Sequence, residues 1–313
     1  MSTTTPSSPP KAVTRRGDRI FSGLSVGSGV AILATLAAVA GFLIYMALPA
    51  ITADSGEVRG GEGLASYVAP LIFGTLYSSI IALIIAFPLS IGIALFITHY
   101  APRRLAAGLG YIIDLLAAVP SIIFGLWGLQ IASDAVPTFG WLNETLGFLP
   151  PFGGNVTVTG RTMLMIGIVL AIMILPIMTA VNREVFLQTP QLHEEASLAL
   201  GATRWEMITQ AVIPFGKSGV ISGAMLGLGR ALGETMAVAI VLSASGSVIS
   251  WELLTSRASG TIAGDIALNF PESFGVERST LFVSGLALFA VTLLVNMFAR
   301  WVISRRSEFS GAN

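Results

Sequence analysis

Six long apolar runs, separated by polar segments, dominate the 313-residue chain. They cover approximately residues 21–48, 71–98, 111–132, 162–182, 218–245 and 279–303. A helix of about 20 predominantly apolar residues crosses the hydrocarbon core of a membrane, so each run is long enough to do so. The first run exceeds the roughly 7–15 apolar residues of a signal peptide, which favours a retained anchor helix. The pattern therefore predicts an all-α integral membrane protein with six transmembrane helices.

Composition supports this prediction, and the basic residues add an orientation. Hydrophobic residues make up 54% of the chain and charged residues only 11%, whereas soluble domains carry about 25% charged residues. If the N-terminus lies inside, 12 of the 17 basic residues fall in inside segments and 4 in outside loops, with Arg230 inside a run. Basic residues are enriched in cytoplasmic segments, so we expect both termini in the cytoplasm. The zero net charge gives no reason to expect a nucleic-acid partner.

The polar segments divide the chain into a long membrane domain and two tails. Residues 1–18, rich in Ser, Thr and Pro and in basic side chains, indicate a disordered basic cytoplasmic tail. Residues 19–306 form the predicted transmembrane domain, which includes a cytoplasmic loop at about 184–217. Residues 307–313 form a short cytoplasmic C-terminal tail.

Prolines and glycines inside the runs predict how the helices bend and pack. Pro88, Pro120 and Pro176 each lie inside a run, and we expect each to bend its helix, because neighbouring helices in a membrane bundle satisfy the freed carbonyl. The fifth run carries four glycines, Gly223, Gly227, Gly229 and Gly233. Small residues let helices approach closely, so we expect the fifth helix to lie in the interior.

The cytoplasmic loop between the fourth and fifth runs predicts two short helices joined at a glycine. Thr189 is a suitable N-cap before Pro190 at the first helical position, and Gly201 is a suitable C-terminal stop. Thr203 and Glu206 have the spacing of a capping box, which begins the second helix. We name residues 189–214 the elbow.

The second helix of the elbow has one apolar face in the sequence. Trp205, Ile208 and Val212 share that face, and we expect Pro214 to end the helix. A short amphipathic helix on the cytoplasmic side of a membrane is most often an interfacial helix without a partner. The residues of the elbow change that interpretation.

The elbow resembles the EAA loop of ABC importer permeases. The resemblance rests on Glu195-Ala196-Ser197, on Gly201 after three intervening residues, and on Ile213-Pro214. The departures are Ser197 in place of a second alanine and Ala211 where isoleucine is common in the family. The resemblance implies a coupling helix that docks on a cytoplasmic ATPase. The residues implied in that coupling are Glu194, Glu195, Ala196 and Gly201.

A second motif near the elbow is misleading. Gly216-Lys217-Ser218 matches the end of a phosphate-binding P-loop, but Ala211 stands where the first glycine is required and no strand precedes it. We therefore expect the chain to bind no ATP itself and to depend on a separate ATPase.

Arg230 and Glu234 are the charged pair inside the fifth run. They are four residues apart, which places them on one face of an unbroken helix. Counted from Ser218, Arg230 lies about 18 Å into the helix, near the middle of the membrane. A structural ion pair between two helices is one interpretation, and a substrate pathway facing a wet cavity is the usual one for charges at this depth. We favour the pathway and expect the two side chains to bond to each other when no anion is present.

Three segments carry a more specific resemblance to the PstC-type permease family of the phosphate-specific ABC transporter. They are Ala118–Gly128, Ala199–Glu206 and Gly229–Val238, and the similarity extends from roughly Gly17 to Arg306. The PstA-type sister family usually has Gly-Glu-Thr-Ala-Pro after the arginine, whereas this chain has Met236 and Ala237.

The resemblance implies a type I ABC importer permease fold and a phosphate importer in a prokaryotic inner membrane. It also implies a PstA-type sister permease, two PstB-type ATPase subunits that carry ATP and magnesium, and a PstS-type extracytoplasmic phosphate-binding protein. The implied role is transport, with no catalytic site, metal or cofactor on this chain.

Other functions remain open at this point. Another oxyanion, such as molybdate or sulfate, is an alternative substrate. A secondary transporter or channel would need no ATPase and has no use for an EAA-like elbow. A purely structural scaffold would not need Arg230 in a membrane span. A membrane-embedded hydrolase is disfavoured because no span brings Ser, His and Asp together.

Overall fold

The computed structural model describes residues 16–242, 248–255 and 259–307, and the described residues form helices and loops without a strand. The predicted tails at residues 1–18 and 307–313 therefore lie almost entirely outside the described residues, as does the end of the predicted fifth run, residues 243–245. The tail predictions remain untested.

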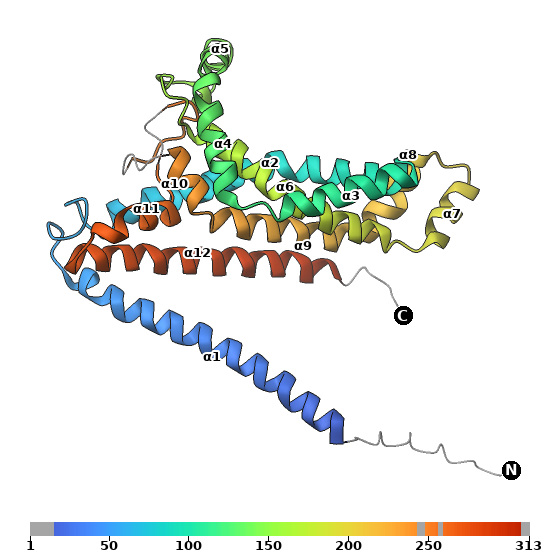
Figure 1. Cartoon of the computed structure of the whole chain (residues 1–313), viewed down its shortest axis with the longest axis horizontal. Coiled ribbons are helices and arrows are strands. Elements are labelled where there is room, and N and C mark those ends of the chain that lie inside the picture. Colours follow the sequence, from blue (N-terminus) through green and yellow to red (C-terminus); the bar gives the residue numbers. More distant parts are fainter. Residues whose placement is uncertain (1–15, 243–247, 256–258, 308–313) are drawn as a thin grey trace.

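Five long helices form the body of the molecule (Figure 1). They are α1 (Arg16–Thr52), α2 (Leu64–Leu95), α6 (Met163–Leu187), α9 (Ile213–Leu232) and α12 (Gly275–Ser307). Two π-helical turns extend α2 and α9: η1 (Phe96–Tyr100) follows α2, and η3 (Ile208–Val212) precedes α9. Within the described residues, five helical segments are long and apolar enough to cross a membrane, and there are six if the bent pair of helices at residues 103–134 counts as one span. The all-α membrane fold is thus confirmed.

The shorter helices connect these long ones. Those before α6 are α3 (Arg103–Ala117), α4 (Ser121–Asp134), α5 (Val136–Leu146) and η2 (Pro150–Phe152). Those of the elbow are α7 (Gln191–Ala199) and α8 (Arg204–Met207). Those before α12 are α10 (Met236–Leu242), α11 (Ile262–Asn269) and η4 (Phe270–Glu272).

Pro120 breaks the third predicted helix instead of bending it. α3 ends at Ala117, α4 begins at Ser121, and the two helices meet at 91°. Proline supplies no amide hydrogen and disfavours helical backbone in the residue before it, so Val119 and Pro120 leave the helix. Pro88 and Pro176, in contrast, lie inside α2 and α6 as expected.

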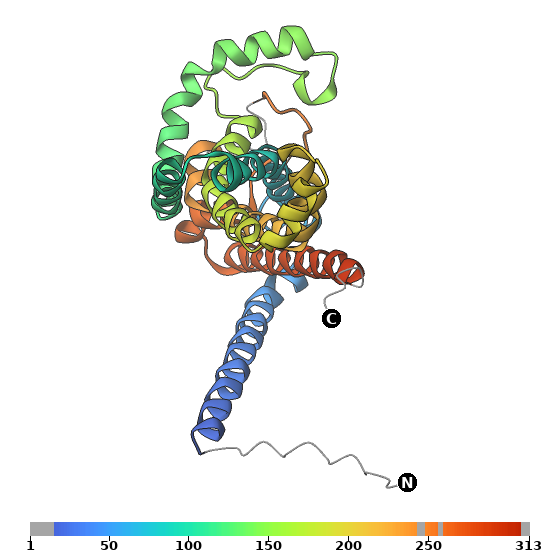
Figure 2. The ribbon, with the colours of Figure 1, turned by 90° about the vertical axis from the view of Figure 1, so that its right-hand side faces the viewer.

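The break at Pro120 directs α4 and α5 away from the bundle. Figure 2 shows this α4–α5 arm on one side of the bundle and α1 leaving on the opposite side. The arm is attached to the bundle through α10: a Cβ added at Gly125 of α4 would lie 2.7 Å from the Cα of Ala237. The close approach at this glycine fixes where the arm leaves the bundle.

The centre of the bundle is α6, with α2 and α9 packed on it. Its apolar span is 61% buried, whereas the span that contains α9 is 33% buried. The fifth helix was expected to lie in the interior; α9 packs on α6, α2 and α12, but α6 is the most buried of these helices. Asn182 of α6 donates a hydrogen bond to the hydroxyl of Ser90 on α2, at 3.1 Å, and so adds a polar contact to this packing.

Glycines on one face of α9 allow its close approach to α6. A Cβ at Gly223 would lie 3.1 Å from the Asn182 amide oxygen, and one at Gly227 would lie 2.7 Å from the sulfur of Met178. Gly229, in contrast, has no atom within 4 Å of its Cβ position. α9 therefore has one face packed on α6 and another that is open.

A polar network joins three segments at the end of the bundle opposite the elbow. Arg59 in the α1–α2 loop donates to Asn269 Oδ1 at 2.6 Å and to the Ser273 hydroxyl at 3.1 Å. The Tyr67 hydroxyl of α2 donates to the Asp265 carboxylate of α11 at 2.6 Å. Burial raises the pKa of the Asp265 carboxyl, although hydrogen bonds and the Arg59 charge act in the opposite direction. We name this group of five residues the outer network.

A notch in α2 receives the chain just before α11. Thr75 accepts a hydrogen bond from the Ile262 amide at 3.0 Å through its hydroxyl oxygen. At Gly74 a Cβ would overlap the Gly260 carbonyl oxygen and would lie 2.8 Å from that of Ser259. This contact therefore requires a glycine at position 74.

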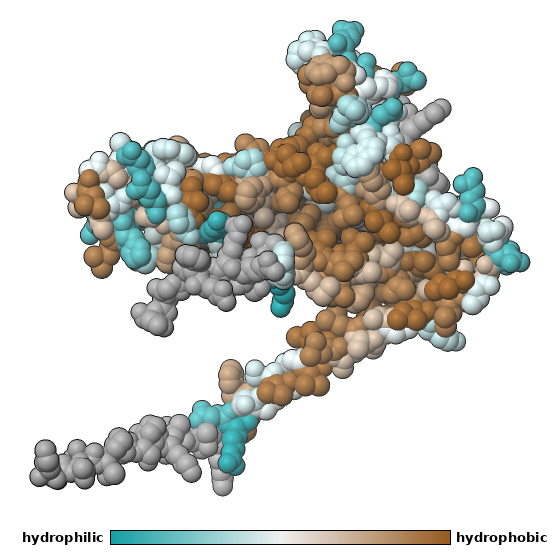
Figure 3. All heavy atoms as spheres, turned by 180° about the vertical axis from the view of Figure 1, so that it is seen from behind, coloured by the Kyte–Doolittle hydropathy of each residue, from teal (hydrophilic) through white to brown (hydrophobic). Residues whose placement is uncertain are grey.

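The surface has the distribution expected for a membrane protein. Figure 3 shows brown apolar residues over the middle of the bundle and along α1, with teal polar residues gathered mainly at the ends and on the projecting arm. Large apolar side chains on α1 and α3, such as Phe21 and Tyr111, are exposed. A hydrocarbon environment accounts for such exposure.

Gly74→Ala tests the notch. We expect it to destabilise the protein by about 1–3 kcal/mol, because the added methyl group overlaps backbone oxygens that have no room to move away. The measurement is the thermal unfolding midpoint of the detergent-solubilised protein. Gly108→Ala in α3 is the matched control, since its Cβ would have no neighbour within 4 Å; equal midpoints for the two variants would contradict the notch.

Candidate functional site

The fifth predicted span is broken beside its charged residues. α9 ends at Leu232, Gly233 follows as its C-cap, and α10 begins at Met236. Arg230 consequently lies in the last turn of α9. It was predicted to lie in the middle of a continuous helix, and that prediction is wrong. Glu234 lies in the break, so the two side chains do not share one face of a single helix.

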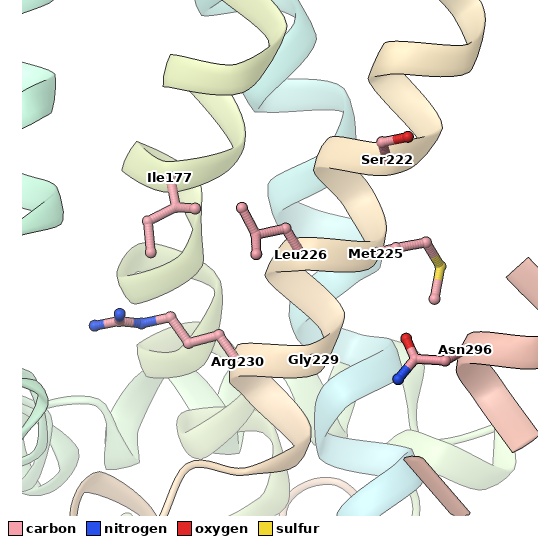
Figure 4. A pocket seen from close by; sticks show the side chains of 7 residues that line it. All are labelled: Ile177, Ser222, Met225, Leu226, Gly229, Arg230 and Asn296. Carbon is pink, nitrogen blue, oxygen red and sulfur yellow. The ribbon is translucent and has the colours of Figure 1, made fainter. Parts of the chain in front are cut away.

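A hollow of about 610 Å³ opens beside α9. It is lined by Ile177 of α6, by Ser222, Met225, Leu226, Gly229 and Arg230 of α9, and by Asn296 of α12. The lining residues of α9 recur at three- and four-residue intervals, which is one stripe of a helix. Figure 4 shows α9 between α6 and α12, with Arg230 pointing toward α6 and Asn296 pointing toward α9 from the other side.

Arg230 carries a charge that no described acidic residue neutralises. Its Nε atom is buried and has no hydrogen-bond partner, and the ion pairs found among the described residues do not include it. The carbonyl end of a helix carries a partial negative charge that stabilises a cation in the last turn, which is where Arg230 lies. The expected bond between Arg230 and Glu234 is therefore wrong for this structure.

Glu234 has a different partner. Its side chain is 8% exposed, and its Oε1 atom accepts a hydrogen bond from the backbone amide of Ala237 at 3.1 Å. An acidic side chain that accepts from the first turn of a helix satisfies an amide that has no partner inside the helix. Glu234 thus caps α10, and it does not line the hollow.

The elbow has the predicted outline, with corrections at both of its ends. The residue before α7 is Pro190 and not Thr189, and it makes no side-chain cap. Thr203 and Glu206 form the predicted capping box: the Thr203 amide donates to Glu206 Oε2 at 2.7 Å, and the Glu206 amide donates to the Thr203 hydroxyl at 3.3 Å. Gly201 has φ +88°, so the chain reverses there through a conformation that glycine adopts without strain.

Pro214 does not end the second elbow helix, contrary to the prediction. It lies in the first turn of α9, and the π turn η3 immediately precedes that turn. The wider π turn separates the proline ring from the helical carbonyl it would otherwise meet. The apolar face is also only partly as predicted, because Ile208 and Val212 are fully buried while Trp205 is 60% exposed.

The candidate coupling residues lie on α7 and the turn after it, at the far end of the bundle (Figure 1). Glu194 is paired with His99 of η1, with 3.5 Å between Oε1 and Nε2, whereas Glu195, Ala196 and Gly201 are exposed. Leu192 and Leu200 on the same segment are 77% and 90% exposed. Glu194 therefore links α7 to η1, whereas Glu195 is exposed on the same segment as the apolar side chains of Leu192 and Leu200.

Comparison with known proteins places this arrangement in a family. Residues 90–308 match the family described as binding-protein-dependent transport system inner membrane component. The phosphate transport system permease protein PstC 2 of Mycobacterium tuberculosis is 44% identical over 91% of this chain and 91% of its own length. The chain belongs to this family, among its PstC-type members. PstC of Mycobacterium leprae is 42% identical over 96% of the chain and 98% of that protein, and PstC of Xylella fastidiosa (strain Temecula1) is 44% identical over 77% and 74%.

Solved structures confirm the ABC importer permease fold. An inward-facing structure of the MetNI methionine ABC transporter matches with a TM-score of 0.53 at 13% identity, over 76% of this chain and 95% of that chain. A bacterial ABC transporter that imports the acidic polysaccharide alginate matches with a TM-score of 0.50 at 17% identity, over 92% and 99%. At these identities the likeness concerns the fold alone.

Three residues of this PstC-type chain were missed in the sequence. His99 pairs with Glu194, a contact that was not identified from the sequence. Asn296 and Ser222 line the hollow with Arg230. A signal for Asn296 was present, because it is the one amide side chain in the sixth apolar run.

Glu234 offers a test of its capping role. Glu234→Ala removes the acceptor for the Ala237 amide, and we expect a loss of about 0.5–2 kcal/mol in stability. Glu234→Gln keeps an oxygen that accepts the same bond, so its unfolding midpoint should stay close to that of the unchanged protein. Equal losses in both variants would show that the carboxylate charge, and not the cap, is what the fold requires.

Proposed function

We propose that this chain is the membrane-spanning permease subunit of an ATP-driven importer for inorganic phosphate. It forms half of the translocation pathway and is itself no enzyme. The observation that carries the proposal is its similarity, along nearly its whole length, to proteins named phosphate transport system permease PstC. The unpaired guanidinium of Arg230 in a membrane span gives that similarity a physical basis, because such a charge attracts an anion.

The proposed assembly has four kinds of subunit. A PstA-type sister permease supplies the second half of the pathway, and its helices close the open side of the hollow. Two PstB-type ATPase subunits bind ATP and magnesium on the cytoplasmic side, and a PstS-type phosphate-binding protein docks outside. The family description itself names a binding-protein-dependent system. The excess of basic residues in the predicted inside segments supports N-in and C-in topology in a prokaryotic inner membrane.

Arg230 is the proposed contact for phosphate in the pathway. Its planar guanidinium binds two oxygens of one phosphate at once, which an ammonium group does not do. With no carboxylate paired to it, an entering anion displaces no internal partner. Glu234 acts on the pathway indirectly, by fixing the start of α10 just beyond the arginine.

The elbow is the proposed contact for the ATPase. Glu195, Ala196 and Gly201 are exposed, and the exposed Leu192 and Leu200 supply apolar area that docking on another subunit would bury. The Glu194–His99 pair joins α7 to the end of α2. η3 continues directly into α9, so a displacement of the elbow is transmitted to the helix that carries Arg230.

Arg230→Lys and Arg230→Gln test the pathway. We expect Arg230→Lys to lose most phosphate import, because the charge remains but the two-oxygen fork does not, and Arg230→Gln to lose essentially all of it. The measurement is uptake of labelled phosphate in cells that produce the other subunits, corrected for the level of each variant in the membrane. Arg104→Gln, an exposed arginine outside the hollow, is the matched control. Near-normal uptake by Arg230→Gln at normal abundance would refute the pathway role.

Gly201→Val and Gly201→Asn test the elbow. A Cβ at Gly201 meets nothing within 4 Å, so any loss comes from backbone strain at φ +88° and not from crowding. Asparagine tolerates this left-handed conformation and a β-branched residue does not. We expect Gly201→Val to reduce both import and recovery of the ATPase with the purified permease, and Gly201→Asn to reduce neither by more than about twofold. Normal import by Gly201→Val would refute the coupling role of the turn.

A further inference from the structure

The wall of the hollow opposite Arg230 belongs to α12 and carries Asn296 (Figure 4). This amide lies in a membrane span of high hydropathy, and it makes no hydrogen bond among the described residues. An amide facing hydrocarbon without a partner is costly, so polar side chains in membrane spans usually face a partner or a wet cavity. Asn296 is exposed and turned toward α9, which places it on the cavity side.

The part of the hollow that is lined by Gly229 carries no side chain. Gly229 lies beside Arg230 in the hollow, and a Cβ at this position would have no neighbour within 4 Å. Figure 4 shows Gly229 on α9 between the Arg230 side chain, which points toward α6, and Asn296, which points toward α9 from α12. Both side chains line the same hollow, so an anion that moves through it would meet the guanidinium and the amide at different places.

The two side chains differ in what they offer to an oxyanion. Arginine only donates hydrogen bonds, whereas an asparagine amide has both a donor group and an acceptor oxygen. Inorganic phosphate near neutral pH carries at least one P–OH group, which needs an acceptor. Glu234 is occupied at the start of α10 and does not line the hollow, and the Ser222 hydroxyl already donates to the Ser218 carbonyl at 2.9 Å.

We infer that Asn296 is a substrate-contacting residue of this pathway, and that its amide oxygen accepts the hydrogen bond from the hydroxyl of a protonated phosphate as the anion passes through the hollow that Arg230 also lines. The inference rests on the proposed function. It assigns part of the site to α12, and it gives the site a neutral acceptor in place of a carboxylate that would repel the anion.

Asn296→Leu and Asn296→Asp, in the complete transporter reconstituted in liposomes, test the inference. The measurements are phosphate uptake, inhibition of that uptake by excess sulfate, and the pH profile of uptake. We expect Asn296→Leu to lower uptake roughly tenfold, as the loss of a hydrogen bond to a charged ligand does, and to make sulfate a stronger inhibitor. Asn296→Asp should shift uptake toward acid pH, because the singly charged, doubly protonated phosphate is repelled less and donates more hydrogen bonds.

Two controls separate this role from a structural one. Thr292→Val removes a polar group one turn away on α12, where the hydroxyl donates to the Phe289 carbonyl at 2.9 Å and does not line the hollow; it should keep the original uptake and pH profile. Recovery of the sister permease with each variant reports assembly. A selective loss of the sister permease in Asn296→Leu would overturn the inference, because the amide would then serve the interface between subunits.

The inference and the proposed function fail in different ways. Unchanged uptake, sulfate inhibition and pH profile in both Asn296 variants would overturn the inference alone, provided that Arg230→Gln still abolishes uptake. If the unchanged transporter imports no phosphate, or if Arg230→Gln imports it normally, the proposed pathway fails and the inference fails with it.

Discussion

The close approach of α9 to α6 is the contact on which the rest of the structure depends. Gly223 and Gly227 bring α9 against Asn182 and Met178 of α6, at distances that a side chain on α9 would prevent. This contact fixes the rotation of α9 about its own axis. Because one face is held on α6, the stripe that contains Gly229 and Arg230 is turned toward the hollow. The same contact therefore packs the bundle and orients the charged residue.

The broken span explains how a buried charge and a buried carboxylate stand close in sequence without pairing. Gly233 ends α9, and the carboxylate of Glu234 is used by the amide of Ala237. The arginine is left to the carbonyl end of α9, whose partial negative charge supports it. Discontinuous helices in membrane proteins commonly have their ends at substrate sites, because irregular backbone is tolerated only where protein or water surrounds it. The order of these residues thus separates a capping carboxylate from an unpaired guanidinium within five positions.

Much of the fold follows from sequence patterns, and the failures have physical causes. The apolar runs predicted the membrane helices, and the capping box at Thr203 and Glu206 formed as its spacing indicated. Pro120, Pro176 and Pro214 look alike in the sequence, yet one breaks a helix, one lies inside a helix and one follows a π turn. The difference depends on neighbours that satisfy or fail to satisfy the freed carbonyl, and these neighbours are distant in sequence.

The candidate site was predicted in part for the same reason. Arg230 stood out because a charge in an apolar run is rare, whereas its bond to Glu234 was inferred from a helical spacing that the break at Gly233 removes. Asn296 comes from a helix more than 60 residues later, and only tertiary packing brings it to the hollow. Local patterns identify residues of unusual chemistry, but long-range packing decides which of them meet.

The unpaired guanidinium of Arg230 also has an electrical consequence. An inside-negative membrane potential opposes the inward movement of each negative charge by about 2.3 kcal/mol per 100 mV. A fixed positive charge in the pathway leaves this total unchanged, but it provides a resting point partway across the membrane. The electrical work is then divided between arrival at the guanidinium and release from it. In the proposed importer, release has to overcome both the remaining potential and the attraction of the arginine, so it is the step that would need the most work from the proposed ATPase.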